Sequence, residues 1–172
     1  MRVRVILVYV VMLLTTPFVL ADDGQRALNS LKGARTLDVS AKKFVADSVQ
    51  GQPVVVAFFA SWCPPCTSEF DEIAKAQKAI GSRPVTFVGI NLFEAWGGAK
   101  DPARMARFIA RTRPSFALIE GTETISAAFG TVDRIPTTTV FGADGREVWR
   151  FVHERGATKT HATAEEILQA LQ

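Results

Sequence analysis

The chain has 172 residues, which is enough for one domain of ordinary size and too few for two. Hydrophobic residues make up 48% of it and charged residues 22%, so the composition is that of a globular protein and excludes a disordered chain. The formal net charge is only +3, and no stretch interleaves lysine and arginine with aromatic residues. Nucleic acid is therefore not expected as a partner.

The first 21 residues have the pattern of a secretory signal peptide. Arg2 and Arg4 precede an apolar run, and the segment ends with Pro17 and the small residue Ala21. The alternative is an uncleaved membrane anchor, because the 17 residues from 5 to 21 reach the lower limit of the ~17–25 that span a bilayer. Cleavage after Ala21 is favoured. It predicts an exported protein, in a bacterium a periplasmic one, and it lowers the net charge from +3 to +1 by removing two arginines.

The rest of the chain is predicted to contain a lead-in and one domain. Residues 22–33 are polar and predict a mobile lead-in, and residues 34–172 form the domain. At the start of the domain, residues 35–40 are expected to form a short edge strand and residues 41–49 a short helix.

Two continuous apolar runs flank a helical pattern in the middle of the chain. The runs 53–60 and 84–92 are rich in β-branched and aromatic residues, as are strands that are buried on both faces of a sheet. Between them, residues 64–80 carry apolar residues at helical spacing and end at Gly81, a common helix stop. Strand, helix and strand in this order indicate a parallel crossover unit.

The C-terminal half adds an inserted segment, a hairpin and further helices. The expected elements are a helix at 101–112 capped by Asp101, a strand at 115–120, a short helix at 123–130, an antiparallel hairpin over 136–153, and a last helix that opens with the capping box of Thr163 and Glu166. The whole order predicts an α/β fold with a central mixed sheet and helices on both faces.

The two cysteines of the chain lie in SWCPPC, where the first buried strand ends and the helix begins. Cys63 is placed at the first turn, where unpaired amides and the positive end of the helix dipole favour a thiolate. Motifs of this kind lower a thiol pKa from about 8.5 to roughly 3.5–7.5. Cys66 lies one turn further in and is expected to be more sheltered, so Cys63 attacks and Cys66 resolves a mixed disulfide. Pro64 and Pro65 suit a first turn and stiffen the loop between the sulfurs.

The cysteine pair has three other interpretations. A structural staple is disfavoured, because a loop of two residues removes little chain entropy. A zinc site would also need His153 and His161, which are eight residues apart rather than the ~3–5 usual in such sites. A Cu(I) carrier that uses only the two thiolates is harder to set aside, because soft sulfur ligands suit that ion.

The segment FFASWCPPC with the helix after it, and RIPTTTVFGADGREV about 70 residues later, resemble the thioredoxin superfamily. The Trp-Cys-Pro-Pro-Cys form and the inserted segment 91–120 are similar to its exported TlpA-like and ResA-like branch of thiol-disulfide oxidoreductases. The resemblance extends from about Gly51 to the C-terminus. It implies a thioredoxin-like three-layer fold, a redox-active disulfide between Cys63 and Cys66, and neither a metal nor another cofactor.

The resemblance also implies roles for residues around the cysteine pair. Pro136 is expected to follow a cis bond, an isomer that costs an X-Pro step only about 0.5–1 kcal/mol. The amide and carbonyl of Ile135 are then expected to pair with an extended substrate segment. An ordinary trans proline at the start of an edge strand is the alternative. Trp62, Pro64 and Pro65 are expected to contact the substrate.

One position departs from the family pattern. Where cytoplasmic thioredoxins have a buried aspartate under the cysteines, this chain has Ala57. ResA-like proteins have a glutamate near the cysteines in the inserted segment, and Glu94 in NLFEA matches its place. A carboxylate whose pKa is raised by burial would take the proton from Cys66. The alternative for Glu94 is a solvated loop glutamate.

The resemblance finally implies partners. It suggests a disulfide-containing client protein and a membrane electron donor that recharges a reductant, with apocytochrome c or a copper-site assembly protein as candidate clients. A monomer is expected. The competing hypothesis is a Cu(I)-binding carrier module that uses the same two thiolates.

Overall fold

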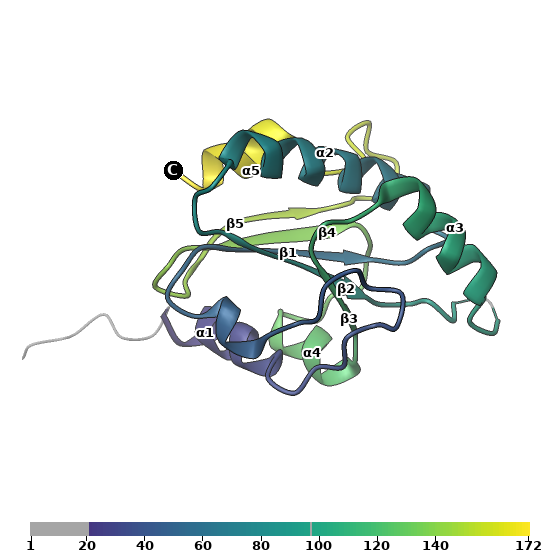
Figure 1. The fold of residues 1–172 in the computed structure, drawn as a ribbon, viewed down its shortest axis with the longest axis horizontal. Coiled ribbons are helices and arrows are strands. Elements are labelled where there is room, and N and C mark those ends of the chain that lie inside the picture. Colours follow the sequence, from purple (N-terminus) through teal and green to yellow (C-terminus); the bar gives the residue numbers. More distant parts are fainter. Residues whose placement is uncertain (1–20, 97) are drawn as a thin grey trace, which may run out of the picture.

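The structure is a computed structural model that describes residues 21–96 and 98–172. The predicted signal peptide lies outside these residues except for its last one, Ala21. The helices and strands in chain order are α1 (Ala21–Ser30), η1 (Ala46–Val49), β1 (Val54–Phe59), α2 (Pro64–Ile80), β2 (Thr86–Asn91), α3 (Pro102–Thr112), β3 (Ala117–Glu120), α4 (Glu123–Ala128), β4 (Thr137–Phe141), β5 (Glu147–Val152) and α5 (Ala164–Ala170). Figure 1 shows a sheet between two groups of helices.

The central sheet has, within the described residues, five strands in the order β3-β2-β1-β4-β5. β1 pairs with β2, and β2 with β3, in parallel, whereas the β1–β4 and β4–β5 pairs are antiparallel. Helices α2, α3 and α5 cover one face of the sheet, and α1 and α4 cover the other (Figure 1). These features confirm the predicted α/β architecture, with a mixed sheet and helices on both faces.

Strand β1 lies at the centre of the sheet, and all six of its side chains are buried. Successive side chains of a strand point to opposite faces, so neighbouring phenylalanines contact different layers. The ring of Phe59 packs against Phe70 of α2 at 4.9 Å and against Phe108 of α3 at 5.2 Å, measured between ring centroids. The ring of Phe58 meets Phe129, after α4, at 5.1 Å. Burial on both faces therefore explains the continuous apolar run.

The helices around the sheet begin and end at the predicted signals. α2 occupies its predicted range and is followed by Gly81, whose φ is 64°. The side chain of Asp101 caps α3, and Thr163 and Glu166 form the capping box of α5. Among the described residues, no helix has both the length and the apolarity needed to cross a bilayer.

Residues 22–33 do not form a mobile lead-in, so that prediction is wrong. Most of them belong to α1, and Leu28 and Leu31 are buried in the core. Gly24 lets the helix approach the β4–β5 hairpin, because a side-chain carbon there would lie 2.3 Å from the carbonyl oxygen of Gly145. The segment is polar on average, and the docking of its few apolar residues stabilises it as a helix.

The next two elements are shorter than predicted. Instead of a strand at 35–40 there is a single bridge between Thr36 and Ile119. Instead of a helix over 41–49 there is only the 3-10 helix η1. The hydroxyl of Thr36 accepts a hydrogen bond from the amide of Phe44 (3.0 Å), and such side-chain to backbone bonds compete with regular structure.

Candidate active site

The two cysteines lie where β1 ends and α2 begins, as predicted. Cys63 is the N-cap of α2 and Cys66 lies in its first turn, and their sulfurs form a disulfide with a Cα–Cα distance of 5.3 Å. The amide of Cys66 donates a hydrogen bond to Sγ of Cys63 (3.2 Å). Pro64, which is exposed, and Pro65, which is half-buried, open the helix where no amide donor is needed. The end of the helix therefore favours an anion on Cys63 once the disulfide is reduced.

Both cysteines are buried in this disulfide form. Cys63 is 3% exposed and Cys66 is 0% exposed. Cys63 is the more exposed of the two, as predicted, but the difference in exposure is much smaller than that expected between an accessible and a sheltered sulfur. The assignment of the attack to Cys63 therefore depends on its place at the N-cap and on the amide that points to its sulfur, rather than on its exposure.

Trp62 is fixed to the inserted segment beside the disulfide. Its indole Nε1 donates a hydrogen bond to the carbonyl oxygen of Phe93 (2.8 Å), a residue with a positive φ of 62°. Its ring meets that of Trp96 edge-on, with 5.3 Å between the ring centroids. Trp96 is 67% exposed. The two tryptophans thus form an aromatic wall whose outer ring is open to solvent.

The aromatic wall of Trp62 and Trp96 is one side of a groove of about 580 Å³, the active-site groove. The other side comes from residues 133–135 and 153–156. The peptide bond between Ile135 and Pro136 is cis, as predicted. Within the described part of the chain, neither the amide nor the carbonyl of Ile135 has a hydrogen-bond partner, so both are free to pair with an extended segment. The two prolines of the cysteine motif lie outside the groove.

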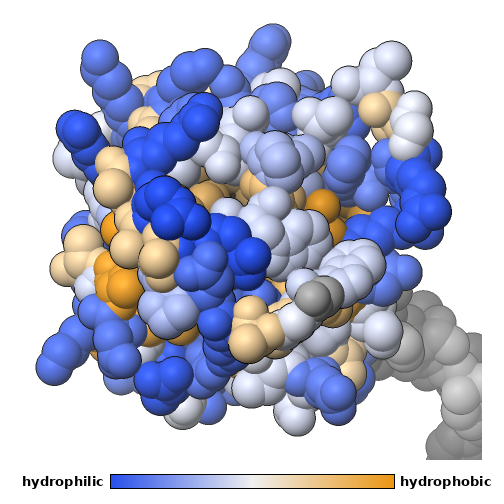
Figure 2. Space-filling model, turned by 90° about the vertical axis from the view of Figure 1, so that its right-hand side faces the viewer, coloured by the Kyte–Doolittle hydropathy of each residue, from blue (hydrophilic) through white to orange (hydrophobic). Residues whose placement is uncertain are grey.

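Figure 2 looks onto the end of the molecule where β1 ends and where α3 lies. The middle of this face is mixed: pale side chains of intermediate hydropathy lie beside a strongly hydrophilic group, and apolar atoms show only in small patches.

Glu94 is buried, at 6% exposed, and supports the loop that leads to the cysteines. Its carboxylate accepts hydrogen bonds from the backbone amide of Ser61 (2.9 Å) and from the Ser61 hydroxyl. The side-chain amide of Asn91 donates to it at 2.8 Å, and the guanidinium of Arg104 lies 3.6 Å away. The alternative of a solvated loop glutamate is therefore wrong. These contacts favour a positioning role, and proton transfer from Cys66 to Glu94 stays a prediction.

A second buried carboxyl group, which is not among the predicted site residues, lies one turn beyond Cys66. Glu69 is 0% exposed and lies on the face of α2 that also buries Cys66 and Phe70. Its Oε1 accepts a hydrogen bond from the amide of Ala162 (3.2 Å). Residues three apart on a helix are neighbours, so Glu69 adjoins Cys66. The helical spacing of the buried residues in α2 is the signal that could have placed this glutamate inside.

The environment of Glu69 favours its protonated form. Burial raises the pKa of Glu69 from an ordinary 4.5 to about 8, and the Ala162 amide and the Thr138 hydroxyl offset this only in part. The contact with Thr138 is poorly formed, because Oε2 of Glu69 and Oγ1 of Thr138 both lack a partner at full hydrogen-bond geometry. Thr138 pairs with Ala57 in the sheet. Helix α2 therefore supplies a buried acid close to the strand position where thioredoxins have an aspartate.

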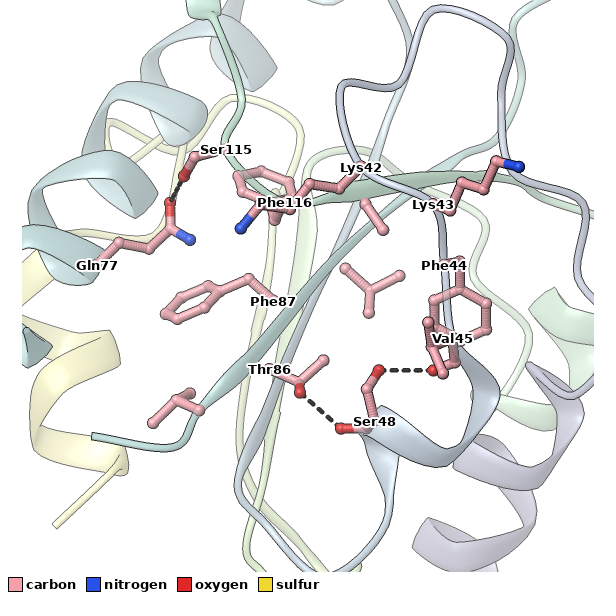
Figure 3. Close-up of a pocket in the computed structure, with 13 residues that line it drawn as sticks. Lys42, Lys43, Phe44, Val45, Ser48, Gln77, Thr86, Phe87, Ser115 and Phe116 are labelled. Carbon is pink, nitrogen blue, oxygen red and sulfur yellow. Dashed lines mark hydrogen bonds between the residues drawn. The ribbon is translucent and has the colours of Figure 1, made fainter. Parts of the chain in front are cut away.

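A second cavity, of about 260 Å³, lies away from the cysteines (Figure 3). Phe87 and Phe116 line it together with several residues of the segment 42–48. None of its lining residues is a sequence neighbour of the cysteine pair or of the cis proline, whereas Trp62 and Ile135 line the active-site groove. Polar side chains on its rim pair with one another, as in the hydrogen bond from the Ser115 hydroxyl to Oε1 of Gln77 (2.9 Å). The reactive groups therefore place the candidate active site at the groove beside the disulfide.

The side chains that a zinc site would need do not come together in the described part of the chain. His153 lines the active-site groove, whereas His161 lies beside Thr160 ahead of α5. Among the described residues, no cluster of three or more His, Cys, Asp or Glu side chains is arranged to hold a metal ion. The geometry at the two sulfurs is that of a disulfide.

Comparisons with known proteins agree with this geometry. The soluble secreted antigen MPT53 of Mycobacterium tuberculosis is 29% identical over 107 residues, which cover 62% of this chain and 57% of that protein. The thiol-disulfide oxidoreductase ResA of Bacillus subtilis is 24% identical over 111 residues, which cover 64% of this chain and 59% of ResA. The chain thus spans less than three fifths of the length of these curated relatives.

A solved structure and a family profile extend the likeness over most of the chain. The crystal structure of a secreted disulfide oxidoreductase of Mycobacterium tuberculosis has a TM-score of 0.61 and 24% identity, and it covers 80% of this chain and 92% of that one. This likeness in fold confirms the thioredoxin-like three-layer arrangement. The Redoxin profile matches residues 20–168. The chain therefore belongs to the Redoxin family.

Proposed function

We propose that this chain is a thiol-disulfide oxidoreductase that exchanges disulfides with partner proteins through Cys63 and Cys66. The observation that carries the proposal is the disulfide at the start of α2, where the amide of Cys66 donates to the sulfur of Cys63. The helix end stabilises an anion on that sulfur, which makes Cys63 the attacking group. The names of the related proteins, which include a thiol-disulfide oxidoreductase, support the same chemistry.

The reaction starts from the reduced dithiol. The thiolate of Cys63 attacks one sulfur of a client disulfide, a mixed disulfide forms, and the other client sulfur leaves as a thiolate. Cys66 then loses its proton and attacks Sγ of Cys63, which breaks the mixed disulfide and releases the second client thiolate. Two electrons pass to the client, and its two thiolates take up two protons from water. Water has received one proton from Cys63 on its ionisation and one from Cys66 by way of the base, and the protein returns to the disulfide form.

We assign the ionised form of Glu69, which becomes populated as the pH approaches about 8, to take the proton of Cys66. It is buried one turn along the same helix. A catalytic base works best when its pKa lies near the working pH, and burial brings the pKa of Glu69 to about 8. Glu94, by contrast, uses both carboxylate oxygens to hold the loop before the cysteines.

The direction of exchange that we propose is reduction of the client. A difference of about 30 mV in reduction potential shifts such an equilibrium tenfold, so direction is a property to be measured. The proposed setting is outside the cytoplasm, with a membrane donor that restores the dithiol and apocytochrome c or a copper-site assembly protein as client. The signal pattern of the first 21 residues and the secreted relative support this setting.

The test is a trapping experiment with the two cysteine variants. Cys66→Ser should accumulate mixed disulfides with clients, because the resolving sulfur is missing, whereas Cys63→Ser should accumulate none. Non-reducing gels and mass spectrometry identify the trapped partners and the cysteine that holds them. Equal trapping by both variants would contradict the assigned roles.

A matched measurement separates the oxidoreductase from a Cu(I) carrier. The reduced native protein should reduce insulin disulfides with turnover in the presence of a thiol donor. Stoichiometric copper binding by the two thiols without insulin reduction would favour the carrier instead.

A further inference from the structure

Among the described residues, Trp96 is the most exposed of the large hydrophobic side chains. Its ring is nevertheless held in place, since it meets Trp62 edge-on at 5.3 Å and lies 6.2 Å from the ring of Phe93, measured between centroids. The indole of Trp62 is in turn hydrogen-bonded to the carbonyl of Phe93. Because the indole is already held in place, a client that binds to it causes little further loss of side-chain entropy.

Ile135, whose amide and carbonyl have no hydrogen-bond partner in the described part of the chain, lines the same groove as Trp96. A client segment that pairs with this backbone is extended, so its side chains alternate between opposite sides. Trp62, which precedes Cys63, lines the groove as well. A side chain one or two positions from the reacting client cysteine can therefore reach the aromatic wall.

The charges of the groove offset one another. Arg134 forms an ion pair with Glu154 and lies 3.9 Å from Asp133, and Arg155 is exposed at the rim. Two arginines are thus matched by two carboxylates, and the groove has no net charge with which to select an acidic or a basic segment. Contact with the aromatic wall is the feature that discriminates among clients.

We propose that Trp96 determines substrate specificity, so that the active-site groove selects extended client segments with a bulky apolar side chain within two residues of the disulfide-bonded cysteine. This inference rests on the proposed oxidoreductase function. Bulky apolar residues are mostly buried in folded proteins. The preferred occupant is therefore an unfolded or partly folded client.

The test compares short peptides that carry one cysteine in a mixed disulfide with glutathione. The peptides are identical except for the residue after the cysteine, which is tryptophan, leucine or serine. The reduced native protein should react with the tryptophan and leucine peptides roughly tenfold faster, in kcat/KM, than with the serine peptide. Trp96→Ala should bring this ratio close to one, mainly through a higher KM for the apolar peptides.

Two further variants serve as controls. Trp96→Phe should keep most of the preference, because an aromatic ring remains on the wall. Val148→Ala removes a side chain that is 52% exposed on β5 and outside the groove, and it should keep the whole preference.

The possible outcomes distinguish the specificity role of Trp96 from the oxidoreductase function of the chain. Equal rates of the native protein with all three peptides, or an unchanged ratio in Trp96→Ala, would overturn the specificity role and leave the oxidoreductase function standing. Failure to reduce any of the peptides would overturn the proposed function and this inference with it. A ratio lost in Trp96→Ala and restored in Trp96→Phe supports the inference, since a general folding defect would lower all three rates together.

Discussion

Replacing Glu69 with glutamine should remove a pH dependence of stability that the native protein has. Glutamine keeps the size of the side chain and an acceptor for the amide of Ala162, but it cannot ionise. In the unfolded chain a glutamate titrates near 4.5, whereas burial raises the pKa of Glu69 to about 8 in the folded protein. Between these two values the folded state binds one proton more than the unfolded state, so stability falls as pH rises.

The size of the effect follows from the pKa of Glu69. Each pH step inside this window lowers the free energy of unfolding by about 1.4 kcal/mol. The full change from 4.5 to about 8 is then on the order of 5 kcal/mol. This contribution to stability is fully present below about pH 4.5 and is lost above about pH 8. It is large beside the ~5–15 kcal/mol by which most domains are stable.

The assay is urea unfolding of the oxidised protein at about pH 5, 6.5 and 8, followed by tryptophan fluorescence. The native midpoint should fall across this range, and that of Glu69→Gln should not fall in the same way. Glu72 offers a matched control on the same helix, because the Lys75 side chain and the Ala164 amide lower its pKa. The contribution of Glu72 to stability is lost as pH falls. The urea midpoint of Glu72→Gln should therefore still decline toward pH 8, as that of the native protein does. Parallel curves for the native protein and Glu69→Gln would refute the reasoning.

Two other substitutions test the loop before the cysteines and the cap of α5. Glu94→Gln should slow disulfide exchange by a similar factor at every pH, because it weakens the contacts with Arg104 and Ser61 that position the loop; a shifted pH-rate profile would instead support proton transfer by Glu94. Thr163→Ala should lower the free energy of unfolding by about 1 kcal/mol, because it removes the capping box of α5, and Thr163→Ser should restore most of it. Thermal unfolding measures this difference, and equal stability of the alanine and serine variants would contradict it.

Local patterns were sufficient to place the cysteines and the elements next to them. The apolar run before Cys63 and the helical spacing after Cys66 are short-range properties of the chain, and the structure has β1 and α2 where they predict them. The same holds for the caps at Asp101 and Thr163, because a cap is formed by residues within one turn. The cis bond before Pro136 was expected from the family resemblance rather than from a local rule.

Segments whose structure depends on distant contacts were predicted less well. The polar segment 22–33 is mostly helical because Leu28 and Leu31 reach the core. The strand expected at 35–40 is reduced to one bridge. Arg35 and Leu37 form backbone hydrogen bonds with β3, but the amide of Ser40 already turns back to the carbonyl of Leu37.

The sequence by itself determined that two cysteines meet at the start of a helix, because strand and helix periodicities are local. Only the tertiary structure decided that the carboxyl group of Glu69 is covered by the segment around Ala162 and that Glu94 holds the loop before the cysteines. The active-site groove likewise joins Trp62 and Trp96 to residues from two later segments. Contacts of this kind form between segments that are far apart in the sequence and come together only on folding. The local pattern of one segment does not specify which other segment it will contact.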